Sequence, residues 1–139
     1  SNRAVDPQDR MIADNLLEAS GDVVWLNEED DINKVTGVAG SGPAYVFYMV
    51  EALAEAAETN GMPPEMAMRF ARQTIVGAAG LLEYDNQTSA EQLRENVTSP
   101  NGTTYAGLQV LMSEDGLVPL MEKTVRAAIE RARELGEDE

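Results

Sequence analysis

A short loop at residues 98–104 carries the side chains best suited to binding a small ligand. It reads Thr-Ser-Pro-Asn-Gly-Thr-Thr and leads directly into a segment with helical spacing. The first backbone N–H groups of a helix have no partner inside it, and nearby hydroxyls add further donors. Such a loop can bind a small carboxylate without a basic side chain. The alternative, which the loop by itself favours, is an ordinary Pro-Asn-Gly turn followed by a threonine N-cap.

A second candidate is the glycine-rich run Gly40-Ser41-Gly42-Pro43, which precedes another helical pattern. Free backbone donors and the helix dipole attract phosphate groups to such a position. The run completes neither a Gly-x-Gly-x-x-Gly dinucleotide fingerprint nor a phosphate-binding loop with Gly-Lys-Ser/Thr, and Pro43 removes one donor. We therefore interpret it as a tight turn before a helix.

Several kinds of catalytic and metal site are excluded by composition. The chain has no cysteine and no histidine, so it lacks thiolate nucleophiles, disulfides, imidazole bases and the usual zinc ligands. Acidic runs occur at residues 28–31 and at Glu114-Asp115, but such runs are typical of solvated surface. We predict no metal-binding residue and no catalytic acid or base.

The net negative charge of the chain argues against some classes of binding partner. The chain holds 25 acidic and 10 basic residues, a formal charge of −15, which repels nucleic acid and anionic lipid. No apolar run approaches the roughly 20 residues that a membrane span needs. We predict neither a nucleic-acid nor a membrane partner. Only Lys34 and Lys123 are lysines, which fits either adaptation to high salt or a merely acidic surface.

The elements before residue 28 predict part of a mixed α/β unit. Residues 7–20 have helical spacing and end at Gly21, and the Val-Val-Trp-Leu run at residues 23–26 is typical of a strand. A lone strand cannot satisfy its own backbone groups. We therefore expect this helix and strand to be the last piece of a sheet that begins upstream. The opening Ser1-Asn2 resembles the remnant of an expression tag.

From residue 28 onward the pattern is helical throughout. Apolar stripes and capping residues predict about six helices, at residues 30–38, 43–60, 64–82, 89–96, 105–112 and 117–135. Gly77 and Gly80 lie inside the third of these, and each costs roughly 1 kcal/mol relative to alanine. That cost suggests that another backbone approaches this face closely. The predicted fold class is an all-α bundle preceded by a residual helix-strand unit.

Three segments in a fixed order resemble the C-terminal half of pyrroline-5-carboxylate reductase. They are Val-Thr-Gly-Val-Ala-Gly-Ser-Gly-Pro-Ala-Tyr-Val-Phe at residues 35–47, Gln73-Thr74 with Gly77-Ala78-Ala79, and Val-Thr-Ser-Pro-Asn-Gly-Thr-Thr at residues 97–104. The resemblance extends in register from about residue 11 to residue 135. It includes the closing Glu-Arg-Ala-Arg-Glu-Leu at residues 130–135.

The resemblance implies a division of the chain into two parts. Residues 1–27 would comprise the tag remnant and the last helix and strand of a truncated Rossmann domain, whose dinucleotide fingerprint lies upstream. Residues 28–139 would form the helical dimerisation and substrate-loop domain. NAD(P)H would be held by the full-length enzyme, with no cofactor-binding residue in this chain. The partner would be a second copy, in a homodimer or a larger ring.

The resemblance also implies a reaction. The full-length enzyme would reduce 1-pyrroline-5-carboxylate to proline in the cytoplasm, whereas this chain alone would be inactive. The carboxylate of this cyclic imino acid would be bound by five loop residues: Ser99, Asn101, Gly102, Thr103 and Thr104. The family usually has Pro-Gly-Gly where this chain has Pro100-Asn101-Gly102, and asparagine tolerates left-handed backbone angles. The alternative is a stand-alone helical oligomerisation module without catalysis.

Overall fold

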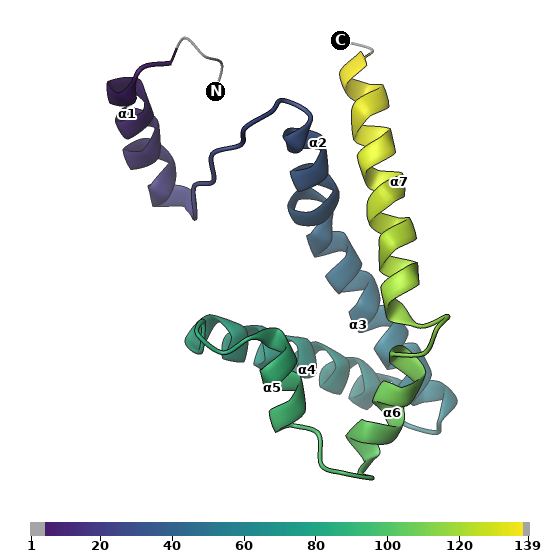
Figure 1. The fold of residues 1–139 in the computed structure, drawn as a ribbon. Helices are drawn as coiled ribbons and strands as arrows, with labels where there is room; N and C mark the ends of the chain where they lie inside the picture. Colours follow the sequence, from purple (N-terminus) through teal and green to yellow (C-terminus); the bar gives the residue numbers. More distant parts are fainter. Residues whose placement is uncertain (1–4, 138–139) are drawn as a thin grey trace.

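A computed structural model describes residues 5–137, and every regular element among them is helical (Figure 1). The predicted tag remnant at Ser1-Asn2 lies outside the described residues. Two short irregular helices accompany the α-helices: a 3-10 turn at Glu18–Ser20 and a π turn at Thr36–Gly40. The α-helices are α1 (Pro7–Leu17), α2 (Asp31–Val35), α3 (Gly42–Thr59), α4 (Pro64–Tyr84), α5 (Ala90–Asn96), α6 (Thr103–Leu111) and α7 (Leu117–Glu137). The predicted all-α fold is confirmed.

The N-terminal unit differs from the prediction in one element. Helix α1 forms as expected, capped by the Asp6 carboxylate, which accepts from two backbone N–H groups of the first turn. The predicted strand at residues 23–26 was wrong, since no described residue pairs with that segment. A strand forms only when a neighbour completes its backbone hydrogen bonds. The segment is tied to α1 instead by Trp25, whose Nε1 donates to Asp14 Oδ1 at 2.7 Å.

A π turn, which the sequence pattern did not predict, joins α2 to α3. The Ser41 N–H donates to the Thr36 carbonyl at 2.9 Å, which closes the wide turn, and the Tyr45 hydroxyl donates to the Gly37 carbonyl at 3.1 Å. Gly37 is buried against α7. A Cβ there would lie 2.6 Å from Ile129 Cγ1, so only glycine lets the two helices approach this closely.

The hydrophobic core of the described residues lies between α3 and α4, which run back to back as a hairpin. Three alanines are its buried members, Ala54 on α3 and Ala67 and Ala71 on α4. Residues this small allow the two backbones to pack closely. The turn between the helices depends on Gly61, whose φ of 93° is a left-handed value that glycine adopts without strain.

Helices α5 and α6 take no part in the extensive helix–helix contacts of the described residues, and the main contacts of α7 are with α2 and the π turn. The chain is consequently open. Its accessible surface is 11458 Å², whereas a compact monomer of its mass exposes about 7,100 Å². Large apolar side chains such as Phe47 and Leu120 are 66% and 59% exposed. Among the helices described here, none has the length and apolar character to cross a membrane.

Candidate functional site

The loop between α5 and α6 is built around one tight turn. The Gly102 N–H donates to the Ser99 carbonyl at 3.0 Å, which closes the turn across Pro100 and Asn101. Asn101 has a φ of 58°, the one left-handed value among the described non-glycine residues. Asparagine adopts this conformation more readily than most residues. The turn expected from Pro-Asn-Gly therefore forms, with asparagine in its left-handed position.

Two neighbouring residues fix the turn in place. The Thr98 hydroxyl donates to the Arg94 carbonyl at 2.6 Å and ties the loop to the end of α5. That hydroxyl is therefore occupied within the chain. Gly102 lies directly beneath the Ser99 side chain, where an added Cβ would clash with the Ser99 hydroxyl and lie 3.1 Å from its carbonyl. A larger residue at Gly102 would require the Ser99 side chain to rotate and the Ser99 carbonyl to shift slightly.

The first turn of α6 presents backbone donors and hydroxyls to solvent. Gly102, not a threonine, is the N-cap, and no side chain caps this end. The predicted threonine N-cap was therefore wrong. The first helical bond runs from the Ala106 N–H to the Gly102 carbonyl at 3.1 Å, so the N–H groups of residues 103–105 precede the helical ladder. By contrast, α5 has a side-chain cap, because the Ser89 hydroxyl accepts a hydrogen bond from the Gln92 backbone N–H at 3.1 Å.

The five predicted site residues thus belong to one continuous structure, and the exposed ones include Ser99, Thr103 and Thr104. The backbone N–H groups of residues 103–105 and the positive end of the α6 dipole lie at the same end of α6 as Thr103 and Thr104. No acidic residue lies in the first turn of α6. This arrangement suits a small carboxylate, which accepts hydrogen bonds and repels no neighbouring charge.

The glycine-rich run at residues 40–43 has a structural role. The Ser41 N–H, which a phosphate would need, already donates to Thr36 in the π turn. Gly42 and Pro43 begin α3. The backbone passes from the π turn through Ser41 into α3 in helical conformation, so the predicted tight turn does not form and the run belongs to a nearly continuous helical segment. Within residues 5–137 no cluster of acidic side chains is arranged to hold a metal ion.

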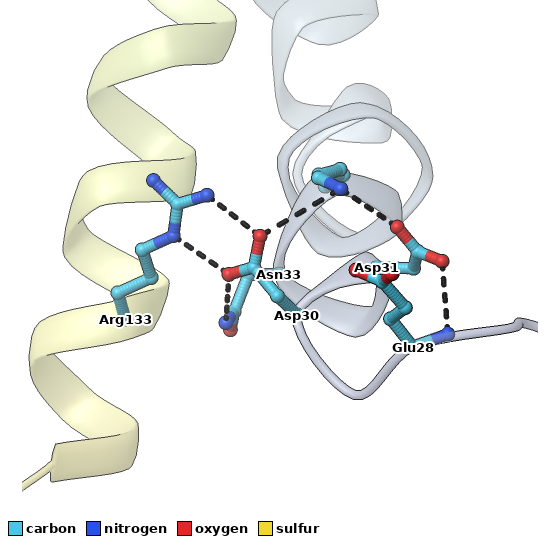
Figure 2. Close-up of polar contacts among 6 residues, drawn as sticks. Glu28, Asp30, Asp31, Asn33 and Arg133 are labelled. Carbon is cyan, nitrogen blue, oxygen red and sulfur yellow. Dashed lines mark hydrogen bonds and ion pairs between the residues drawn. The ribbon is translucent and has the colours of Figure 1, made fainter.

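The acidic run at residues 28–31 is more than solvated surface, because two of its carboxylates are engaged (Figure 2). Asp30 accepts from Arg133 Nε and Nη2, each at 2.8 Å, in a bidentate pair between α7 and the start of α2. The Arg133 guanidinium, followed by the Asn33 amide, holds the pKa of Asp30 well below its usual range. Asp31 accepts from Lys34 Nζ at 2.7 Å, which lowers the pKa of Asp31.

Sequence reasoning did not identify the Asp30–Arg133 pair. Its members are 103 residues apart, and neither lies in a pattern that marks it as special. Ten basic residues were available to 25 acidic ones, so a pairing between two of them could not be selected. Arg133 does lie in the Glu-Arg-Ala-Arg-Glu-Leu segment at residues 130–135, which is part of the family resemblance. That resemblance implies no role for Arg133.

Comparison with known proteins gives a consistent result. Residues 29–135 match the family model described as pyrroline-5-carboxylate reductase dimerisation. A pyrroline-5-carboxylate reductase of Synechocystis is 41% identical over 98% of this chain and 50% of its own length. One from Pseudomonas aeruginosa is 41% identical over 90% of this chain and 45% of its own length. The chain therefore spans about half the length of the curated relatives it matches.

Solved structures agree with these relatives. A pyrroline-5-carboxylate reductase from Coxiella burnetii superposes with a TM-score of 0.86 at 42% identity, covering 96% of this chain and 49% of that one. The Plasmodium falciparum pyrroline carboxylate reductase, solved with NADP bound, gives a TM-score of 0.76 at 29% identity, covering 98% of this chain and 51% of that one. The helical arrangement seen here is shared by both.

Proposed function

The chain belongs to the pyrroline-5-carboxylate reductase family, and on that premise we propose that it is the C-terminal, substrate-binding and self-associating part of such a reductase. In the proposed reaction a hydride adds to the imine carbon of 1-pyrroline-5-carboxylate and the ring nitrogen carries a proton, which yields proline. Residues 28–139 would be the dimerisation domain, a boundary supported by the family match from residue 29. A cytoplasmic location stays a prediction.

The chain's own residues do not suit a dinucleotide. The glycine-rich run at residues 40–43 uses its Ser41 donor internally, and Pro43 lacks a backbone N–H. NAD(P)H, which supplies the hydride when bound, would therefore be held by a part of the reductase outside this chain. The Plasmodium falciparum relative, solved with NADP bound, supports a nicotinamide cofactor for the family.

In the proposed site, the turn at residues 99–102 and the first turn of α6 bind the substrate carboxylate. The observation that carries this proposal is the uncapped start of α6, where three backbone N–H groups adjoin the Thr103 and Thr104 hydroxyls. Binding the carboxylate would satisfy these donors and orient the ring. The chain would then contribute by positioning the imine, which needs neither histidine nor cysteine.

Family membership supports self-association, and the open surface supports a homodimer. Each chain exposes about 4,000 Å² more than a compact monomer of its mass, which is more than the roughly 1,000–2,500 Å² that each partner buries in a common obligate homodimer. Exposed apolar residues lie on several helices, including Phe47 on α3, Phe70 on α4 and Leu120 on α7. A second copy with the same exposed faces would cover them, and the dimer could assemble further into a ring.

The substrate proposal is tested by removing one hydroxyl at a time in the full-length reductase. Thr104→Val should raise the KM for 1-pyrroline-5-carboxylate by about tenfold or more, because a hydrogen bond to a charged group is lost. The KM for the nicotinamide cofactor should stay the same. Thr124→Val is the matched control, since the Thr124 hydroxyl donates to Leu120 within α7 at 2.9 Å. Equal substrate KM values for the two variants would contradict the proposed site.

The assembly proposal is tested by light scattering on this chain at low and at molar salt. We expect twice the chain mass of 15.1 kDa, or a multiple of it. A salt-adapted acidic surface should also melt at higher temperature in molar salt, because counterions screen the repulsion within a chain of charge −15. A folded monomer at both salt concentrations would contradict the homodimer.

A further inference from the structure

Helix α7 is attached to the rest of its own chain at two places one helical turn apart. At the first, Gly37 of the π turn lies against Ile129 and the Val125 carbonyl. At the second, Arg133 forms its bidentate pair with Asp30 (Figure 2). Ile129 and Arg133 are four residues apart, so they share one face of α7. We call the Asp30–Arg133 pair the latch.

The two contacts constrain different features of the geometry between α7 and α2. Close contact at Gly37, together with the other contacts of α7 with the π turn and α2, sets how near the helices come, but apolar contacts have no fixed direction. The latch adds a second point with a defined direction, because a guanidinium grips a carboxylate in a planar, two-bond geometry. Together they fix both the distance and the angle of α7 against α2.

The latch also determines where the preceding chain enters the helices. Asp30 stands immediately before α2, inside a turn that the Asp31 N–H closes by donating to the Glu28 carbonyl at 3.1 Å. The Asp31 carboxylate accepts from the Glu28 N–H at 3.2 Å, which stiffens the same turn. Residues 22–27 lead directly into this turn, so their direction follows the position of Asp30 (Figure 1).

We propose that the Asp30–Arg133 latch is a positioning element that fixes the segment before α2 relative to the helical domain. This inference rests on the proposed function in one respect: in the full-length reductase, the latch would hold the cofactor-bearing part in register with the bound imine. Asp30 and Arg133 touch neither substrate nor cofactor in this role. Their side chains are 42% and 46% exposed, so the latch can be released without breaking the core.

The mechanical claim is tested on this chain by hydrogen exchange. Arg133→Gln should accelerate amide exchange across residues 28–40 by about fivefold or more, because the turn loses its anchor on α7. Arg131→Gln is the matched control: Arg131 pairs with Glu134 inside α7 at 2.6 Å, so the charge change is equal and no interhelical contact is lost. Equal exchange in the two variants would overturn the latch.

The positioning claim is tested by kinetics of the full-length reductase. Arg133→Gln should lower kcat by about tenfold with the substrate KM within about twofold, since a small misplacement of reacting groups costs rate more than binding. Arg133→Lys keeps the positive charge but cannot form the two parallel hydrogen bonds of a guanidinium, so its kcat should lie between those of the original protein and Arg133→Gln. The exchange of Asp30→Arg with Arg133→Asp should recover part of the loss.

Three results would overturn the positioning role: a kcat equal to that of Arg131→Gln, a loss confined to the substrate KM, or dissociation of the assembly in Arg133→Gln. The last of these would make the pair a support of assembly instead. If the unmodified full-length protein showed no reductase activity, the proposed function would fail. The hydrogen-exchange comparison would still decide whether the latch exists.

Discussion

The α3–α4 hairpin and the α5–loop–α6 segment differ in how much they pack against the rest of the chain. The hairpin contains all of the buried apolar residues described, Ala54, Ala67 and Ala71, and its two helices cover each other. The other segment packs extensively on no helix of the chain, yet it carries the proposed binding residues. The buried core and the proposed binding residues therefore lie in separate segments of the sequence.

The difference shows how a binding loop can be ordered without a core. Its shape comes from local hydrogen bonds: the Ser89 cap of α5, the Thr98 bond to Arg94 and the turn from Ser99 to Gly102. Such bonds depend on neighbouring residues and survive without tertiary packing. The place of the loop in space must instead be set by contacts beyond α5 and α6, for which a second copy is the proposed source.

The largest expected effect breaks the hairpin. Ala71→Asp would place a carboxylate at a position that is 2% exposed, which should lower the free energy of unfolding by about 3 kcal/mol or more. Ala90→Asp is the control, because residue 90 is exposed in the first turn of α5, where a negative charge is favourable. Thermal melting followed by circular dichroism measures both. Equal melting temperatures would show that the alanine core is not what holds the hairpin.

The second effect tests what covers the outer face of the hairpin. Outside the adjoining turns of α4, no atom of residues 5–137 lies within 4 Å of a Cβ built at Gly77, so under the proposed assembly the close backbone predicted from that glycine would belong to another copy. Gly77→Leu should weaken the dimer by about a hundredfold, since a side chain would block the approach. Gly136→Leu, also at an open helical glycine, is the control. An unchanged dimer in sedimentation equilibrium would refute this packing.

The third prediction distinguishes the contribution of the loop to substrate binding from its contribution to stability. Asn101→Val places a β-branched residue at a φ of 58°, a strain of about 1–2 kcal/mol. Because α5 and α6 contribute little packing, the melting temperature should move by only a few degrees. The substrate KM of the full-length reductase should rise about tenfold, whereas Asn101→Gly should leave it near the original value. A large drop in melting temperature with unchanged KM would reverse the assignment of the two regions.

The smallest effect concerns the latch and pH. The folded-state pKa of Asp30 lies below its ordinary value of 3.8, so the ionised pair stabilises the fold above that pH and the contribution is lost as pH falls through the folded-state pKa. The original chain should melt slightly above Asp30→Asn at pH 7, and the gap should begin to narrow below about pH 4 and close only as pH falls through the folded-state pKa. Glu134→Gln, which removes a pair within α7, is the control. A gap that persists in acid would mean that the pair acts by packing alone.

Helix boundaries were predictable because local chemistry sets them. Pro64 begins α4 and Gly61 turns the chain before it; Ser89 caps α5, although the Gln92 side chain bonds Asn96 at 3.1 Å instead of reaching back to complete a capping box. The loop residues were also predictable, since turn chemistry and the family resemblance indicated the same segment. Whether they bind the substrate stays a prediction.

Other features depended on residues far apart in the sequence. The strand at residues 23–26 was wrong because strand formation needs a partner that the pattern cannot supply. The π turn was missed, and it includes Gly37, whose close contact with Ile129 of α7 joins residues far apart in the sequence. Gly102 replaced threonine as the cap of α6 because the turn closing on Ser99 is followed by a helix that starts at Thr103, two residues before the predicted start at residue 105.

The sequence by itself determined the helical class and the order of the helices, because hydrophobic spacing, caps and turn residues act over a few positions. The family followed from the resemblance of three ordered segments. Tertiary structure alone decided which acidic residue would be paired, which glycine would sit in a helix contact and how little of the apolar surface one chain can bury. Those outcomes depend on two surfaces meeting in space. The residue pattern of a single segment specifies which surface that segment presents, but not which other surface it will contact.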